Sequence, residues 1–386
     1  MTYEDELEVS INSLEKLNNF IEVSDIEEQK LKEVVKRHPM CITQYYMSLI
    51  DPNDPHDPIR KMIVPSIEEL DASGIYDTSG ECENTKLVGL QHKYSQTVLI
   101  LATNRCAAYC RYCFRKRLVG LPNKEIINKF SEAANYINDN KEINNVLISG
   151  GDPFVLPTQL IEEFLELLSP ISHLNFIRFG TRVPVTFPGR ILGDPDLLEV
   201  LESHSKKNRR IYIVTHFNHP REITNKSTDA IDRLIRCGLI ISNQAVLLKG
   251  VNDNADTLAE LQNKLVSIGV NPYYVFQCRP VKRVKRHFQV SLYRGYKLIE
   301  NAKAMLNGQS KRFRYVMSHR TGKIEIIGIT PNEEHFIFKY HQAKHPSKIG
   351  RVFRRRLDKV AGWLDDLEPV FSSPVCVTDT MEELNA

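Results

Sequence analysis

The sequence predicts an α/β protein whose parallel sheet curves into a partial barrel of six β/α units. Six near-continuous apolar runs follow one another between residues 97 and 278, as expected of strands that are buried on both faces. Amphipathic segments lie between these runs, and several begin with Asp, Asn or Thr and end with Gly, the residue types that cap helices. Regular alternation of strand and helix favours a parallel sheet with helices on its outer face.

The predicted strands are rich in β-branched and aliphatic residues. They are TVLILAT (97–103), NNVLISGG (144–151), NFIRFGTR (175–182), RIYIVTHFN (210–218), LIISNQAVLLKG (239–250) and NPYYVFQC (271–278). The helices predicted between them repeat apolar residues at the spacing of one helical face. They are TQLIEEFLELL (158–168), PDLLEVLESHS (195–205), TDAIDRLIRCG (228–238) and DNADTLAELQNKLVSIG (253–269).

The residues before the barrel predict a helical region. Helical patterns occupy residues 6–22 and 27–38. The polar, proline-containing stretch at 50–65 predicts an arm that wraps around the molecule rather than forming a core.

The residues after the barrel predict a small β/α extension. Three short runs between residues 312 and 341 predict strands of an antiparallel sheet, and residues 351–367 predict an amphipathic helix. The expected organisation is a helical region with a wrapping arm at 1–96, a barrel at 97–310 and a C-terminal β/α extension at 311–386.

The composition argues against several classes of protein. The formal charge of +3 is small for 386 residues, and most basic residues are spread along the chain, so nucleic acid is not an expected partner. The N-terminus has no secretory pattern, and no stretch reaches the roughly 18 apolar residues of a membrane span. We therefore expect a cytoplasmic protein without a membrane partner.

Three of the eight cysteines, Cys106, Cys110 and Cys113, form a C-x3-C-x2-C motif directly after the first predicted strand. Barrel enzymes build their active sites at this end of the sheet. Three thiolates there could bind three irons of a [4Fe-4S] cluster and leave the fourth iron open. Zinc and a purely structural thiol cluster are the alternatives, but a zinc site needs a further ligand pair, and the sequence shows no second C-x2-C or H-x3-H.

The motif in this position resembles the signature of the radical S-adenosylmethionine (SAM) enzymes, and more particularly the lysine 2,3-aminomutase family. The resemblance implies a partial (β/α)6 barrel of the radical SAM type, in which SAM binds the open iron and is cleaved to a 5'-deoxyadenosyl radical. Blocks that look like those of the family recur in order. They are ITQYYMSLIDPNDPHDPIRK, GLQHKYSQTVLIL, YCRYCFRKR, VLISGGDP, RFGTRVPV, THFNHPREIT, NQAVLLKGVND and YYVFQC.

The family resemblance assigns SAM contacts to the ends of three strands. The SGGDP segment (Ser149, Gly150, Gly151 and Asp152) would meet the amine and carboxylate of SAM. His216 and Gln244 would face the nucleoside. A tight turn after a strand and a hydrogen-bonded core histidine are the alternative interpretations.

The basic run after Cys113 has one implied role. In the family, the arginine two residues after the third cysteine holds the carboxylate of the substrate, and this residue is Arg115. We expect Lys116 and Arg117 to be a solvated charge run.

The family also implies pyridoxal 5'-phosphate, held through the amine of a lysine. Lys323, which follows Gly322, is the candidate, and Tyr94 stands where the family has a tyrosine that contacts the cofactor. Thr97 stands where the family commonly has a phosphate-binding arginine, so phosphate binding must be rebuilt from other groups or be absent. An exposed turn lysine is the alternative interpretation of Lys323.

The substrate residues depart most from the lysine enzymes. Those enzymes bind the distal ammonium with two aspartates, whereas Arg279 and Ser318 occupy the corresponding positions here. Arg279 would repel a lysine side chain and would suit an acidic side chain or another anionic group.

Three functions are compatible with these residues. The first is an amino-acid 2,3-aminomutase that moves the α-amino group to the β-carbon of glutamate or another non-basic amino acid. The second is a radical SAM enzyme on the same scaffold that acts without pyridoxal phosphate on another small acid or peptide. The third is a redox sensor or structural cluster, which would have no use for a nucleoside pocket. A flavodoxin or ferredoxin electron donor and a homo-oligomer are the expected partners.

Overall fold

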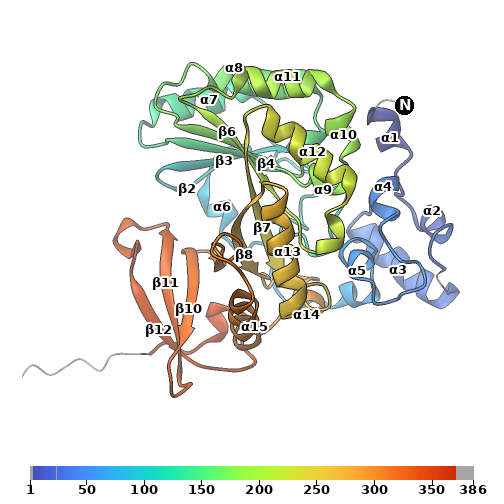
Figure 1. Ribbon diagram of the computed structural model, residues 1–386, viewed down its shortest axis with the longest axis vertical. Helices are drawn as coiled ribbons and strands as arrows, with labels where there is room; N and C mark the ends of the chain where they lie inside the picture. Colours follow the sequence, from blue (N-terminus) through green and yellow to red (C-terminus); the bar gives the residue numbers. More distant parts are fainter. Residues whose placement is uncertain (1–2, 23, 371–386) are drawn as a thin grey trace, which may run out of the picture.

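A parallel sheet of seven strands forms the centre of the molecule (Figure 1). The strands are β3 (Thr97–Thr103), β4 (Asn145–Gly150), β5 (Phe176–Gly180), β6 (Arg210–Thr215), β7 (Ile240–Leu247), β8 (Asn271–Gln277) and β9 (Arg314–His319). The computed structural model describes residues 3–22 and 24–370. All six predicted barrel strands are confirmed. β9, predicted as a strand of the antiparallel C-terminal sheet, pairs parallel with β8 and adds a seventh strand.

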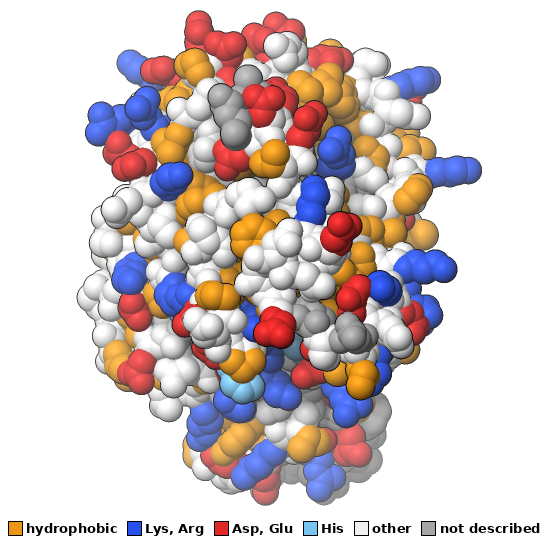
Figure 2. All heavy atoms as spheres, turned by 90° about the vertical axis from the view of Figure 1, so that its right-hand side faces the viewer, with side chains coloured by type: hydrophobic (Ala, Val, Ile, Leu, Met, Phe, Trp, Pro, Cys, Tyr) orange, Lys and Arg blue, Asp and Glu red, His pale blue; other side chains and the backbone are white. Residues whose placement is uncertain are grey.

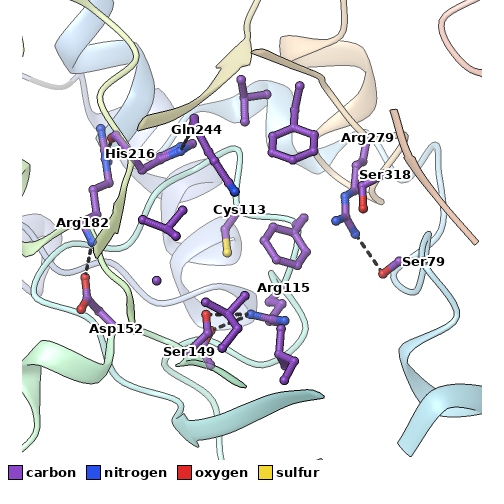
Figure 3. A pocket seen from close by; sticks show the side chains of 18 of the residues that line it. Ser79, Cys113, Arg115, Ser149, Asp152, Arg182, His216, Gln244, Arg279 and Ser318 are labelled. Atoms are coloured by element: carbon purple, nitrogen blue, oxygen red, sulfur yellow. Dashed lines mark hydrogen bonds between the residues drawn. The ribbon is translucent and has the colours of Figure 1, made fainter. Parts of the chain in front are cut away.

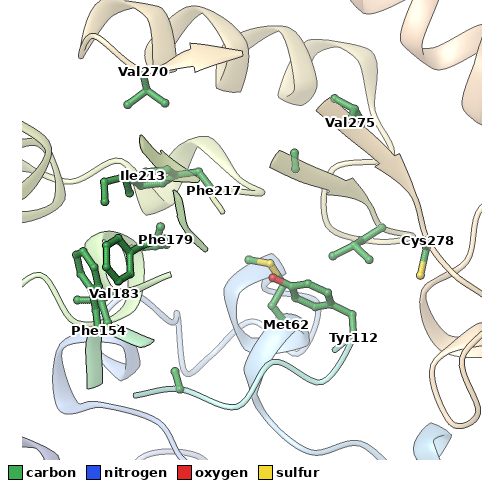
Figure 4. Close-up of a cluster of buried hydrophobic side chains, with 14 of the residues drawn as sticks. Met62, Tyr112, Phe154, Phe179, Val183, Ile213, Phe217, Val270, Val275 and Cys278 are labelled. Atoms are coloured by element: carbon green, nitrogen blue, oxygen red, sulfur yellow. The ribbon is translucent and has the colours of Figure 1, made fainter. Parts of the chain in front are cut away.

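Side chains alternate between the two faces of these strands. On β5, Ile177 and Phe179 are buried under the helices, whereas Arg178 and Gly180 line an internal cavity. Figure 4 shows Phe179 packed with Phe154 and Val183 in the buried layer. A strand of this sheet therefore tolerates a polar residue on its inner face.

Helices cover the outer face of the sheet. The crossover helices are α7 (Phe130–Asp139), α8 (Thr158–Leu168), α9 (Val183–Thr186), α10 (Gly189–Leu192), α11 (Pro195–His204), α12 (Asn225–Arg236) and α13 (Ala255–Ser267). The four predicted helices correspond to α8, α11, α12 and α13. The capping residues act as expected, since the Asp194 carboxylate accepts from the amide of Leu197 and the Asn254 side chain from that of Asp256. After β8 follow α14 (Lys285–Phe288) and α15 (Leu292–Ala304).

The N-terminal region is helical but more broken than predicted. It contains α1 (Tyr3–Glu8), α2 (Leu14–Asn18), α3 (Asp25–Arg37), α4 (Gln44–Met47), α5 (Pro58–Ile63) and α6 (Glu81–Asn84), followed by β1 (Thr85–Leu87) and β2 (Leu90–Tyr94). The pattern at 6–22 splits because Ile11 forms a β-bridge with Ile42 and Ser13 caps a new helix.

The arm at 50–65 contributes to the core, contrary to the prediction. Asp57 caps α5, and Pro58 occupies its first turn. Ile59, Met62 and Ile63 are then spaced along one helical face and fully buried.

The C-terminal strands continue the same sheet. They are β10 (Gly322–Ile329), β11 (His335–Ala343) and β12 (Val352–Arg356), and all three pair antiparallel. The helix predicted at 351–367 is wrong: this segment forms β12 and a short 3-10 turn. The reason is Phe353, whose ring packs on Phe338 at 5.4 Å and Tyr340 at 5.2 Å between centroids and so aligns the segment with β11.

The predicted division of the chain at residues 96 and 310 stays a prediction, and residues 371–386 of its last part lie outside the described residues. Among the described residues, no helix is both long and apolar enough to cross a membrane. On the face drawn in Figure 2, acidic and basic side chains are interspersed.

Candidate active site

One cavity of about 360 Å³ opens at the carboxyl ends of the parallel strands. Every residue that the sequence analysis named for the site lines it. These residues are Tyr94, Cys106, Cys110, Cys113, Arg115, Ser149, Gly150, Gly151, Asp152, His216, Gln244, Arg279, Ser318 and Lys323. Figure 3 shows His216 and Gln244 on one side of Cys113 and Arg279 with Ser79 on the other.

The three cysteines lie on the loop after β3 with their thiols unpaired and partly buried. Burial raises the pKa of Cys106, and burial with the neighbouring Cys110 raises that of Cys113 to about 11. Arg182 donates from Nη1 to Cys110 Sγ at 2.8 Å. In the described part of the chain, no three His, Cys, Asp or Glu side chains converge on a single metal ion. A [4Fe-4S] cluster fits this arrangement because each thiolate binds a separate iron.

Glu69 anchors two basic side chains of the cysteine loop. Its carboxylate accepts from Arg111 at 2.7 Å and from Lys116 at 2.5 Å, and all three side chains are buried. Burial alone would raise the pKa of Glu69, but the two cations lower it to about 2. The expectation that Lys116 is solvated is therefore wrong, because Lys116 is buried in an ion pair. The sequence does not indicate this pair, because Glu69 lies far from Lys116 along the chain.

Glu81 anchors the other two basic side chains of the run. Its carboxylate accepts from Arg115 Nε at 3.0 Å and from Arg117 Nη2 at 2.7 Å. Arg117 also pairs with Glu125, so its predicted solvation is wrong too. Arg115 keeps Nη1 within reach of Ser149 Oγ, at 3.4 Å, in the cavity.

The backbone of the cysteine loop is bound to the N-terminal region. The amide of Tyr109 donates to the carbonyl of Cys41 at 2.9 Å, and the amide of Arg111 to that of Met62 at 2.8 Å. The Arg111 guanidinium also donates to the carbonyls of Pro39 and His38. The region before the barrel thus helps to shape the loop that carries the cysteines.

The SGGDP segment packs directly against the same loop. A Cβ on Gly150, where φ is +117°, would lie 2.4 Å from the carbonyl oxygen of Thr103, and one on Gly151 would lie 2.2 Å from that of Arg105. Only glycine allows these approaches. The amides of Gly151 and Asp152 donate to these two carbonyls.

The carboxylate of Asp152 is engaged within the protein. It accepts from the hydroxyl of Thr181 and the amide of Arg182, both at 2.6 Å. Burial raises its pKa. This carboxylate therefore connects the end of β4 to the loop after β5.

His216 and Gln244 meet at one wall of the cavity. His216 hydrogen-bonds through Nδ1 to the carbonyl of Gln244 and through Nε2 to the hydroxyl of Tyr112, at 3.0 Å for the latter. Burial lowers the pKa of His216 to about 4, so the ring is neutral at pH 7. The side chain of Gln244 extends toward Cys113 (Figure 3).

Lys323 lies on the inner wall rather than in an exposed turn. Its Nζ is 4.7 Å from the ring centroid of Tyr274. Burial lowers its pKa to about 7, and the nearby cations Arg178, Arg279 and Lys93 act in the same direction. At pH 7 about half of such a lysine is neutral and can react as an amine with an aldehyde.

Arg279 occupies the end of the cavity nearest Ser79. Its Nη1 donates to Ser79 Oγ at 2.9 Å, and its guanidinium stacks 4.2 Å from the centroid of Phe114. Arg115 lies 4.6 Å from the centroid of the same ring. Burial lowers the pKa of Arg279 to about 10, which leaves it cationic at pH 7. Ser318 is buried in the same wall.

Several residues of the site were not predicted from the sequence. Arg178 was detectable, since it is a charged residue in an apolar strand, the signal that marked His216. The partners Glu69 and Glu81 carry no local signal, because only the fold brings them to the cysteine loop.

Comparison with known proteins gives concordant matches. The Radical SAM superfamily matches residues 100–261. L-lysine 2,3-aminomutase of Methanococcus maripaludis is 41% identical over 308 residues, covering 78% of this chain and 69% of that protein. L-lysine 2,3-aminomutase of Clostridium subterminale is 38% identical over 301 residues, covering 77% and 71%. Glutamate 2,3-aminomutase of Clostridioides difficile (strain 630) is 37% identical over 314 residues, covering 80% and 72%.

The fold and the cysteine loop thus define a radical SAM enzyme. More particularly, the chain belongs to the lysine 2,3-aminomutase family, as the relatives at this identity and coverage show.

Replacing Glu69 should destabilise the protein strongly. The Glu69→Gln variant leaves Arg111 and Lys116 buried without their counter-charge, so the free energy of unfolding should fall by about 3–5 kcal/mol. Urea denaturation measures this loss. The control is Glu33→Gln, which breaks an exposed pair with Arg37 and should cost less than about 1 kcal/mol. Because the pKa of Glu69 is lowered, its stabilisation is present above about pH 4.3 and declines as the pH falls toward 2. Equal losses in the two variants would contradict this account.

Lys323 should react as an amine at unusually low pH. Reductive methylation with formaldehyde needs a neutral amine, so labelling of Lys323 should be half-maximal near pH 7. Ordinary lysines reach this point near pH 10.4. Peptide mass spectrometry across a pH series measures both, and Lys323→Ala verifies the assignment. A midpoint for Lys323 in the ordinary range would refute the effect of burial and neighbouring cations.

Proposed function

We propose that this enzyme is a 2,3-aminomutase that moves the α-amino group of an amino acid with an anionic side chain to its β-carbon. The observation that carries the choice of substrate is Arg279, a half-buried cation at the far end of the cavity. It would attract a side-chain carboxylate and repel a lysine ammonium. The glutamate 2,3-aminomutase among the relatives makes glutamate the first candidate.

The cysteine loop supports the assignment of the iron-sulfur cluster. Cys106, Cys110 and Cys113 are the proposed ligands, since their thiols are unpaired and line one cavity. The SGGDP segment, His216 and Gln244 are the proposed contacts of SAM. Among these, Gln244 offers a side-chain amide that extends into the cavity.

The opposite wall supports the assignment of pyridoxal phosphate. Lys323 is the proposed attachment point because the pKa of its amine, beside the ring of Tyr274, is lowered to about 7. Tyr94, at the end of β2, lines the same cavity. When bound, the cluster and SAM supply hydrogen-atom abstraction, and pyridoxal phosphate supplies the chemistry of nitrogen transfer.

Two arginines are the proposed substrate contacts. Arg115 would bind the α-carboxylate through the part of its guanidinium that Glu81 does not occupy. Arg279 would bind the side-chain carboxylate, with Ser79 and Ser318 as neighbouring hydroxyls. These two contacts would hold the amino acid by both ends beside the cluster.

The remaining proposals concern the surroundings of the enzyme. We place it in the cytoplasm, where its cysteines would stay reduced. Reduction of the cluster would come from an acidic flavodoxin or ferredoxin, which the basic segments of the chain would attract. A homo-oligomer is the proposed assembly.

The pyridoxal phosphate content separates the proposed function from a radical SAM reaction without this cofactor. After anaerobic reconstitution, the wild-type protein should retain about one equivalent, and Lys323→Ala should lose it. Mass spectrometry of the extracted cofactor measures both. A wild-type protein that retains none after incubation with pyridoxal phosphate would exclude the aminomutase and favour the cofactor-independent reaction.

Arg279 should determine the substrate. The wild-type enzyme should rearrange glutamate in preference to lysine, and Arg279→Asp should lower kcat/KM for glutamate by about 100-fold or more, because it replaces an attraction by a repulsion. Mass spectrometry of the β-amino acid product measures both substrates. Arg294→Asp, at an exposed residue outside the cavity, is the control and should leave kcat/KM unchanged. An unchanged preference in Arg279→Asp would refute the role of Arg279.

A further inference from the structure

Arg178 is a cation of the cavity that lacks a counter-ion. It lies on the inner face of β5, and burial lowers its pKa. Its hydrogen bond within the described part of the chain runs from Nη2 to Asn145 Oδ1, while Nε is buried without a partner. A half-buried guanidinium with a buried, unpartnered Nε and no counter-ion favours an anionic ligand.

The residue at position 97 is linked to Arg178. Asn145 Nδ2 donates to Thr97 Oγ1 at 3.0 Å and to the carbonyl of Gln96 at 2.9 Å. These bonds orient the amide of Asn145 so that its oxygen faces Arg178. Thr97 on β3 therefore helps to orient Arg178 on β5 through Asn145. In the family, position 97 is commonly an arginine that binds phosphate.

The other cations of the cavity are engaged elsewhere. Lys93 donates from Nζ to the carbonyls of Ser79 and His319, at 3.0 and 2.7 Å. Arg279 donates to Ser79 and stacks on Phe114. Arg178 also has unused donors, and among these cations its charge lowers the pKa of Lys323 most, after burial itself.

We infer that Arg178, oriented by Asn145 and Thr97, binds the phosphate group of the aldehyde cofactor attached to Lys323. A phosphate monoester carries between one and two negative charges and accepts two parallel hydrogen bonds from a guanidinium. Arg178 thereby replaces the missing arginine at position 97. This inference rests on the proposed function, since it requires pyridoxal phosphate as the ligand.

Binding of the cofactor with and without its phosphate tests the inference. Equilibrium dialysis of the reconstituted full-length protein gives the Kd for pyridoxal phosphate and for pyridoxal. Arg178→Gln should raise the Kd for pyridoxal phosphate about tenfold or more and leave that for pyridoxal within about twofold. The Kd of Arg178→Lys for pyridoxal phosphate should lie between those of the wild type and Arg178→Gln, because lysine keeps the charge. Inorganic phosphate should compete with pyridoxal phosphate in the wild type and lose this effect in Arg178→Gln.

Arg209→Gln is the matched control. Arg209 also has a buried Nε without a partner, but its guanidinium donates to the carbonyls of Leu168 and Ile171 outside the cavity. Its replacement should change neither Kd. Retained binding of pyridoxal by Arg178→Gln verifies that this variant is folded.

Two results would overturn the inference alone. In one, Arg178→Gln weakens pyridoxal and pyridoxal phosphate equally; in the other, it weakens neither while Lys323→Ala abolishes binding of both. A wild-type protein that binds no pyridoxal phosphate would instead refute the proposed function together with the inference.

Discussion

The site depends on two buried glutamates that neutralise the basic residues around the cysteines. Glu69 pairs with Arg111 and Lys116, and Glu81 pairs with Arg115 and Arg117. These pairs hold a loop that has no regular secondary structure of its own. Since a buried ion pair is stable only when its geometry and remaining hydrogen bonds are satisfied, the pairs restrict the loop to one conformation. The helices and turns before the barrel are therefore part of the active site.

The other half of the cavity has the opposite electrostatic character. None of its four cations pairs with a carboxylate within the described residues. Lys93 donates to backbone carbonyls, Arg178 to the side-chain amide of Asn145 and Arg279 to a serine hydroxyl, and Lys323 lies against the ring of Tyr274. Burial and the neighbouring positive charges together lower the pKa of Lys323, and positive charge without carboxylate partners favours anionic ligands. Carboxylates of the protein thus neutralise the cations of the cysteine loop, whereas the four cations on the opposite side have no carboxylate partner among the described residues.

The sequence predicts those features whose signals are local. The barrel strands are recognisable because each is a short apolar run between helical patterns, and the cysteines because their spacing is itself the signal. Lys116 could not be placed, because its partner Glu69 is 47 positions away. The segment at 351–367 carries helical periodicity, but the pairing of its first residues with β11 overrides this preference.

Phe114 joins the two electrostatic halves. Its ring contacts Arg115, whose carboxylate partner is supplied by the protein, and Arg279, which has a serine hydroxyl instead. Because Glu81 fixes one edge of Arg115, the guanidinium is held in one position facing the cavity. Arg279 has no such carboxylate partner among the described residues, so its positive charge would attract a carboxylate of a ligand. Position 279 lies outside the cysteine loop and contacts it through the ring of Phe114, so a change of residue there changes the charge at this end of the cavity and leaves the ion pairs of Glu69 and Glu81 in place.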